Sequence, residues 1–112
     1  MKHIIVIIRP EKLDDVRNAL EKVGYSGLMI SEISGHGKQK GVVQQWRGEK
    51  YKVDLIPKVK LEVVVKDSEL GIIKKTIIEN ARTGDIGDGK MFISDVAEVV
   101  RIRTGEEGEI AL

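Results

Sequence analysis

Cysteine is absent from the sequence, and aromatic side chains are few: one Phe, two Tyr and one Trp. Without cysteine the chain has neither disulfides nor thiolate chemistry. So few aromatic residues indicate a core built from aliphatic side chains. Neither sign of charge dominates, because 19 Lys and Arg stand against 18 Asp and Glu. That balance excludes a broadly basic nucleic-acid surface but leaves room for a local basic cluster.

A long hydrophobic run is also missing. The apolar run Ile4–Ile8 meets Arg9 at once, so it is far too short for a signal peptide or a membrane span. We therefore expect a cytoplasmic protein. A chain of 112 residues suits one hydrophobic core, so we expect a single domain over residues 1–112.

The first part of the chain predicts a strand, a helix and a second strand. His3–Arg9 is rich in β-branched residues and ends at Pro10, which suits a first helical turn. Gly27–Ser34 reads as the second strand. Between them, apolar residues recur at helical spacing until Gly24, at Leu13, Val16, Leu20 and Val23.

The stretch at about 37–57 has no sustained period. A loop of about 20 residues in so small a domain is either functional or disordered. Within it, Val42-Val43 and Val53–Ile56 are candidates for the two arms of a loose ribbon.

The second half repeats the order of the first. Asp67 or Ser68 is expected to cap a helix whose apolar stripe is Leu70, Ile73, Ile77 and Ala81. Met91–Val96 and Val99–Arg103 predict a last strand that is bent in the middle. Before the helix, Lys58–Lys66 alternates strictly, and its inward face is Val59, Leu61, Val63 and Val65.

This order predicts an α+β, ferredoxin-like βαββαβ fold, with two right-handed split βαβ units on one antiparallel four-stranded sheet. The long loop falls between the second and third strands. Two helices cover only one face of such a sheet. Because Ile4–Ile8 is apolar at every position, the other face also needs cover, which another copy of the sheet would supply. We therefore predict a closed homo-oligomer.

The stretch Thr83–Lys90, called the glycine turn below, is the strongest candidate for a binding site. Gly84, Gly87 and Gly89 let the backbone bend sharply and approach a ligand. A row of backbone N–H groups forms an anion-binding concavity, to which Lys90 adds a charge. The Walker A spacing is missing, and Gly-Asp-Gly is also common in ordinary turns. A phosphate cradle and a plain turn therefore both stay open.

Arg101 and Arg103 are expected to share a face of the last strand, about 7 Å apart, where a polyphosphate would bridge them. The alternative is a solvated edge strand whose arginines pair with carboxylates. Since Lys90 leads into the same strand, we expect three cations and the glycine turn to meet at one end of the sheet. Lys58 begins the third strand and could hold a carboxylate there, whereas Gln39 alone reads as ordinary loop polarity.

Trp46, Arg47 and Tyr51 lie in the unpatterned loop and suggest a protein-contact surface. The alternative is an aromatic ring folded back on its own sheet. His3 and His36 are far apart in the sequence, and neither a metal-ligand spacing nor a Ser/His/Asp set is evident. We therefore expect a binding protein and no enzyme. A phosphohydrolase is the second reading, and an RNA-binding sheet is disfavoured because the central strands lack stacking aromatics.

Four motifs together resemble the PII nitrogen-regulatory signalling proteins of the GlnB/GlnK type, along nearly the whole chain. They are Arg9-Pro10, Tyr51 followed by Val53–Lys60, Thr83 with Gly87–Phe92, and Arg101–Thr104 with the next Gly-Glu. The resemblance implies a homotrimer with ATP or ADP in each cleft between subunits. It also implies a sensor of nitrogen status, with the long loop (the T-loop) docking on partners.

The resemblance also implies roles for particular residues. A Mg²⁺ ion shared by ATP and 2-oxoglutarate would be ligated by Gln39, and Lys58 would pair with the distal carboxylate of that acid. The full 2-oxoglutarate set would be Gln39, Lys40, Gly41, Lys58 and Gly87. The nucleotide set would be Met29, Gly35, Gly37, Lys38, Gln39, Glu62, Val64, Gly87, Asp88, Gly89, Lys90, Arg101 and Arg103.

The implied partner is an ammonium transporter of the Amt/AmtB type, with Arg47 as the plug residue and reversible recruitment to the membrane. Glutamine synthetase and other nitrogen-metabolism proteins are further candidates. Three departures from the family pattern stand out. The flank of Tyr51 differs from the usual modification motif, which leaves its uridylylation or adenylylation open. Lys38 replaces a common arginine, and Met29 replaces a common threonine.

Overall fold

The computed structural model describes residues 1–25, 27–35, 42–46, 49–53 and 56–112, and it describes 42–46 and 49–53 by their backbone only. The strands are β1 (Lys2–Ile8), β2 (Met29–Gly35), β3 (Val42–Trp46), β4 (Glu49–Val53), β5 (Ile56–Val65) and β6 (Lys90–Asp95). The α-helices are α1 (Leu13–Lys22) and α2 (Leu70–Ala81). Short 3₁₀ helices are η1 (Pro10–Lys12), η2 (Asp67–Glu69) and η3 (Gly108–Ala111).

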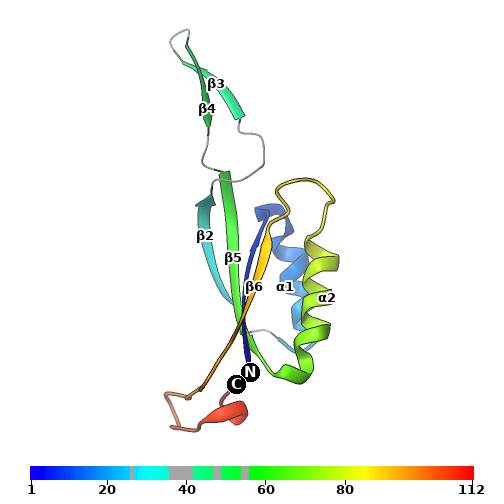
Figure 1. Ribbon diagram of the computed structural model, residues 1–112, viewed down its shortest axis with the longest axis vertical. Coiled ribbons are helices and arrows are strands. Elements are labelled where there is room, and N and C mark those ends of the chain that lie inside the picture. Colours follow the sequence, from blue (N-terminus) through cyan, green and yellow to red (C-terminus); the bar gives the residue numbers. More distant parts are fainter. Residues whose placement is uncertain (26, 36–41, 47–48, 54–55) are drawn as a thin grey trace.

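The main sheet has four antiparallel strands in the order β2-β5-β1-β6, and both α-helices lie on one of its faces (Figure 1). This arrangement confirms the α+β, ferredoxin-like βαββαβ prediction. The register pairs Ile4 with Val63 on one side and with Ile93 on the other. The central strands β1 and β5 are therefore fixed by pairing along both of their edges.

The hydrophobic core lies between the sheet and the helices and is entirely aliphatic. Strict alternation sends every second residue of β1 and β5 inward, and the helices contribute their apolar stripes. The predicted inward face of the third strand and the stripe of the second helix are both confirmed, although Leu70 is only partly buried. The buried apolar side chains are Ile4, Val6, Ile8, Val16, Leu20, Val59, Leu61, Val63, Val65, Ile73, Ile77 and Ala81.

The start of the second helix differs from expectation. Neither Asp67 nor Ser68 makes a side-chain capping bond; the chain enters α2 through η2, where the Glu69 N–H donates to the Lys66 carbonyl at 3.0 Å. The Asp67 carboxylate instead accepts from the Met1 ammonium group at 3.0 Å. The Asp67 carboxylate, which the local sequence predicted to cap the helix, is therefore paired with the ammonium group of a residue far away in the sequence.

A two-stranded hairpin, β3–β4, lies beyond the ends of β2 and β5 and away from the helices (Figure 1). Its register pairs Val42 with Val53 and Val43 with Lys52. The ribbon expectation is confirmed for its first arm. The second arm is Glu49–Val53, and Ile56 belongs to β5.

The last strand is shorter than predicted, because β6 ends at Asp95. Residues Val99–Gly108, called the C-terminal hairpin below, reverse direction around a turn at 102–104, and Val100 bridges to Glu107. Gly105 and Gly108 have φ values of 73° and 81°, which other residues rarely adopt. The alternation of apolar and charged residues in Val99–Arg103 was therefore misread as a strand.

Candidate functional site

The glycine turn is a bent segment packed against the end of β1. Gly84, Gly87 and Gly89 have φ values of 94°, 106° and 101°. A Cβ atom at position 89 would lie 1.7 Å from the carbonyl oxygen of Ile7, so only glycine fits there. The expected sharp bends are therefore confirmed, while close approach to a ligand stays a prediction, because the close approach seen at Gly89 is to the chain itself.

The carboxylate of Asp88 organises the first half of this turn. It accepts from the Thr83 N–H at 2.8 Å, from the Gly84 N–H at 2.9 Å and from the Thr83 hydroxyl. Arg9 donates to it through Nε at 3.0 Å. The Thr83 hydroxyl and the Gly84 N–H, followed by the Thr83 N–H and Arg9, hold the pKa of Asp88 well below its usual range. Asp88 thus stays ionised and ties the turn together.

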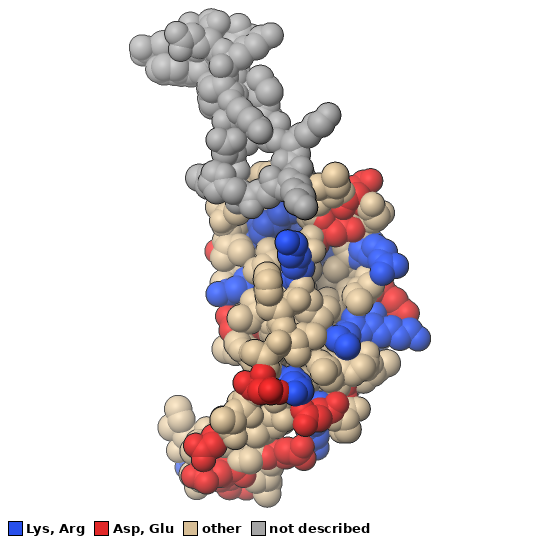
Figure 2. All heavy atoms as spheres, viewed as in Figure 1, with Lys and Arg blue, Asp and Glu red and all other residues tan. Residues whose placement is uncertain are grey.

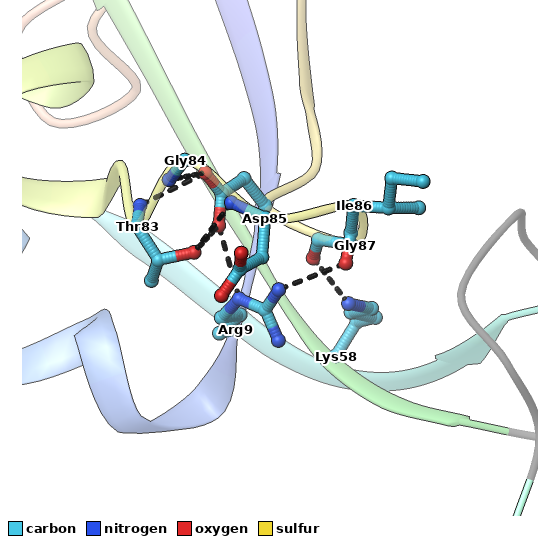
Figure 3. A network of polar contacts seen from close by, with 8 residues as sticks. Arg9, Lys58, Thr83, Gly84, Asp85, Ile86 and Gly87 are labelled. Atoms are coloured by element: carbon cyan, nitrogen blue, oxygen red, sulfur yellow. Dashed lines mark hydrogen bonds and ion pairs between the residues drawn. The ribbon is translucent and has the colours of Figure 1, made fainter.

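Two cations bind neighbouring carbonyl groups in the second half of the turn (Figure 3). Arg9 Nη2 donates to the Ile86 oxygen at 3.0 Å, and Lys58 Nζ donates to the Gly87 oxygen at 2.6 Å. Burial, followed by the nearby charge of Arg9, lowers the pKa of Lys58. The contact brings together Lys58 and Gly87, two residues of the predicted 2-oxoglutarate set.

Glu62 lies on the sheet face that no helix covers, in a small charged cluster. It contacts His3 Nε2 at 3.0 Å and Lys60 Nζ at 3.3 Å. The hydrogen bond with His3, followed by that with Lys60, lowers the pKa of Glu62. Met29 pairs with Glu62 in the register, and Val64 pairs with His3, so three members of the predicted nucleotide set share this face.

Lys90 is exposed at the start of β6, beside a cavity of about 180 Å³. Arg82, Asp88 and Gly89 also line this cavity, together with apolar side chains of β1 and α2. Lys58 lines a second cavity, of about 370 Å³, with Glu32 and Pro57. The first cavity is therefore lined in part by the glycine turn itself, and the second by Lys58, whose Nζ contacts that turn.

Arg101 and Arg103 do not share a strand face, which corrects the prediction. They lie in the C-terminal hairpin, where Arg101 Nη1 contacts Glu106 Oε1 at 2.7 Å and Nη2 donates to the Ile110 oxygen at 2.9 Å. The hairpin and the glycine turn lie at opposite ends of the sheet (Figure 1), separated by the length of β6, about 17 Å. Within one chain, the three cations therefore do not converge.

The body of the protein and its C-terminal segment also differ in charge. On the face seen in Figure 2, Lys and Arg are interspersed with Asp and Glu over the body of the protein, whereas Asp and Glu predominate over the C-terminal segment at the lower end. The acidic side chains of that segment are Asp95, Glu98, Glu106, Glu107 and Glu109.

Several predicted residues lie outside the described part of the chain. These are Gly37, Lys38, Gln39, Lys40, Gly41 and Arg47, and the side chains of Trp46 and Tyr51 are not described either. Gly35 ends β2, paired with Ile56. Among the described residues, no cluster of three or more His, Cys, Asp or Glu side chains is close enough to hold a metal ion.

Arg9 is the site residue that sequence reasoning overlooked. It was interpreted as the end of a strand and as part of a family motif, without a binding role, yet its side chain is 14 % exposed and contacts both Asp88 and the Ile86 carbonyl. No local pattern points to this role, because the two partners follow it by 79 and 77 residues.

Comparison with known proteins identifies the family of the chain. The family model of the nitrogen regulatory protein P-II matches residues 1–106. The chain belongs to the P-II family. Nitrogen regulatory protein P-II 2 of Methanothermobacter thermautotrophicus is 54 % identical over 112 residues, which are all of this chain and 97 % of that protein. Nitrogen regulatory protein P-II 1 of Escherichia coli K12 is also 54 % identical, with both chains covered in full.

Membership of the P-II family supports a role in nitrogen regulatory signalling. In the part of the chain that the structure describes, no helix is both long enough and apolar enough to span a membrane.

Proposed function

We propose that this protein senses ATP or ADP together with 2-oxoglutarate, and that it controls partner proteins through the segment between β2 and β5. The observation that carries the proposal is the pair of cations, Arg9 and Lys58, bound to the glycine turn. Lys58 lies near the start of β5, where that segment ends, and it contacts the glycine turn, which is expected to bind phosphate. A ligand that engages Lys58 would thereby affect both regions.

The nucleotide site is proposed to need two copies of the chain. Lys90 and the glycine turn come from one end of a subunit, whereas Arg101 and Arg103 come from the other end. A contact between the hairpin of one copy and the turn of the next joins two different surfaces, and such contacts form a ring when the rotation between copies closes. The phosphate-binding arginines would then belong to the neighbouring subunit.

The sheet face without helices favours the same assembly. Ile5, Ile7 and Val64 are only half-buried there, and Met29 and Phe92 are 55 % and 56 % exposed. Burying this apolar area against further copies is favourable. We propose a homotrimer, and analytical ultracentrifugation should give three times the chain mass of 12.5 kDa. A monomer at micromolar concentration would contradict it.

Glu62, Met29, Val64 and the Gly35 backbone are proposed to line the nucleoside, since they lie along β2 and β5 on or beside this face. Mg²⁺ would join the ATP phosphates to 2-oxoglutarate through Gln39. Lys40 and Gly41 would contact the same acid, while Gly37 and Lys38 would contact the nucleotide. The proposal assigns no catalytic step to the chain.

Calorimetry tests the coupling between the two ligands. The wild type should bind 2-oxoglutarate with Mg-ATP present and lose that binding when ATP is omitted or replaced by ADP. Lys58→Met should abolish the response, while Lys22→Met, an exposed lysine at the end of α1, should keep it. Equal binding of 2-oxoglutarate with and without Mg-ATP would refute the coupling.

The proposed partner is an ammonium transporter of the Amt/AmtB type, and glutamine synthetase is a further candidate. A pull-down from native membranes, with ADP, with ATP, and with ATP plus 2-oxoglutarate, tests the first. Retention should depend on the ligand and should fall for Arg47→Ala, whereas Arg17→Ala should behave as the wild type. Mass spectrometry of cellular protein would show whether Tyr51 is modified.

A further inference from the structure

The carbonyl groups of Ile86 and Gly87 face the same side of the glycine turn. Figure 3 shows both oxygens directed at cationic side chains, Ile86 at Arg9 and Gly87 at Lys58. Neighbouring carbonyls do not share a side in a strand, where they alternate. Here the positive φ of Gly87, 106°, permits the arrangement.

The direction of these carbonyls also fixes the direction of two N–H groups. A trans peptide is planar, so the N–H of each residue points away from the carbonyl before it. The N–H of Gly87 therefore points away from Arg9, and the N–H of Asp88 points away from Lys58. Two successive N–H groups on one side form a concavity that binds anions.

The first half of the turn is different. There the N–H groups of Thr83 and Gly84 donate to the carboxylate of Asp88. Arg9 contacts both halves, because Nε donates to that carboxylate and Nη2 donates to the Ile86 oxygen. Arg9 therefore helps to fix the orientation of both pairs of amides: those of Thr83 and Gly84 face the Asp88 carboxylate, and those of Gly87 and Asp88 face away from the two cations.

We propose that Arg9 is a positioning residue for phosphate binding. Its proposed role is to hold the Gly87 and Asp88 N–H groups outward through the bonds of Nε to Asp88 and of Nη2 to Ile86, and not to bind the phosphate itself. This inference rests on the proposed binding of nucleotide at the glycine turn.

The test compares the affinities of four proteins for Mg-ATP and for adenosine by calorimetry. The variants are Arg9→Leu, Arg9→Lys and a matched control, Arg17→Leu, which removes the same charge from an exposed residue of α1. Losing two charge-assisted hydrogen bonds should weaken Mg-ATP binding by about 30-fold in Arg9→Leu. Adenosine should bind all four proteins alike, because it carries no phosphate.

Arg9→Lys separates positioning from simple attraction. Lysine keeps the charge, but its single nitrogen does not reproduce the two-point contact with Asp88 and Ile86. We expect about a tenfold loss of Mg-ATP affinity in this variant. Affinity equal to the wild type in Arg9→Lys would show that charge alone matters and would overturn the inference.

Amide NMR adds a direct readout of orientation. On saturation with Mg-ATP, the Gly87 and Asp88 amide protons should move downfield in the wild type and in Arg17→Leu, but not in Arg9→Lys. If Arg9→Leu does not fold, this readout and the Arg9→Lys affinities still decide the question.

The inference and the proposed function fail in different ways. If the wild type binds Mg-ATP and both Arg9 variants bind it equally well, only the positioning role is refuted. If the wild type does not bind Mg-ATP, the proposed function fails and the positioning role fails with it.

Discussion

The glycine turn and the C-terminal hairpin are both glycine-containing turns that carry cations, yet they are held in opposite ways. The turn is fixed from outside itself: Arg9 comes from the end of β1, Lys58 from β5, and Gly89 packs against Ile7. The described contacts of the hairpin join it to itself or to η3, including Arg101 N–H to the Glu106 oxygen at 2.9 Å.

The two regions therefore depend on different parts of the protein for their shape and position. The body of the subunit dictates the shape of the turn, so one chain suffices to build it. The hairpin keeps its own shape, but few contacts fix its position, and Ile102 at its tip is 99 % exposed. A neighbouring copy is the proposed source of that missing constraint.

Adding a single methyl group should destabilise the glycine turn far more than the C-terminal hairpin. Gly89→Ala places a Cβ 1.7 Å from the Ile7 oxygen and should lower the free energy of unfolding by at least about 3 kcal/mol. Gly105→Ala meets open space at a φ of 73° and should cost about 1 kcal/mol. Urea unfolding followed by circular dichroism at fixed protein concentration measures both. Equal losses of unfolding free energy in the two variants would contradict the proposed difference between the glycine turn and the hairpin.

The carboxylate at the centre of the turn predicts a pH dependence. The pKa of Asp88 is lowered by folding, so its contribution is complete above the usual aspartate value and is lost as pH falls below it. Asp88→Asn should therefore be less stable than the wild type at pH 7, and the gap should close on acidification. Asp85→Asn, an exposed neighbour, is the control. A gap independent of pH would contradict the organising role of the carboxylate.

A smaller effect is expected when the ion pair of the hairpin is removed. Glu106→Gln weakens the 2.7 Å contact with Arg101. Because both side chains are about one-third exposed, the free energy of unfolding should change by less than about 1 kcal/mol. Hydrogen exchange should instead become faster within Val99–Gly108 and stay unchanged in the glycine turn. Faster exchange in the turn as well would show that the two regions are coupled within one chain.

The smallest effect on folding is expected at the tip of the hairpin. Ile102→Ser should change the free energy of subunit unfolding by no more than about 0.5 kcal/mol, because the side chain is already exposed. If a second copy covers the tip, the same variant should dissociate at higher protein concentration. Sedimentation of the two proteins across a dilution series compares them, and identical dissociation would remove the tip from the interface.

Local patterns were enough to predict most of the fold. The alternation of Val59, Leu61, Val63 and Val65 and the helical spacing of Val16 and Leu20 each record which face meets the core. This periodicity arises because one face of a strand or helix is buried and the other is exposed. It can therefore be read from the element's own sequence, without the rest of the chain.

The sequence was misleading where residues outside the local alternation decide the conformation. Val99–Arg103 alternates as a strand does, but the reversal depends on Gly105 and Gly108 beyond it. The binding of Asp88 to a nucleotide is not tested by these contacts, but its carboxylate has partners that the local pattern did not reveal, namely Thr83, Gly84 and Arg9. Contact with a nucleotide through its backbone N–H stays a prediction. The pairing with Arg9, 79 residues earlier, arises from the three-dimensional arrangement of strands, which no local window contains.

The all-aliphatic core has a practical consequence for spectroscopy. Among the side chains that the structure describes, no aromatic ring is buried between the helices and the sheet, although the partly buried Tyr25 packs against the core. The only tryptophan, Trp46, lies in β3 of the projecting hairpin. Intrinsic fluorescence excited at tryptophan wavelengths should therefore be nearly blind to the centre of the subunit. It offers instead a label-free reporter, already encoded in the chain, for events at the segment proposed to meet partners.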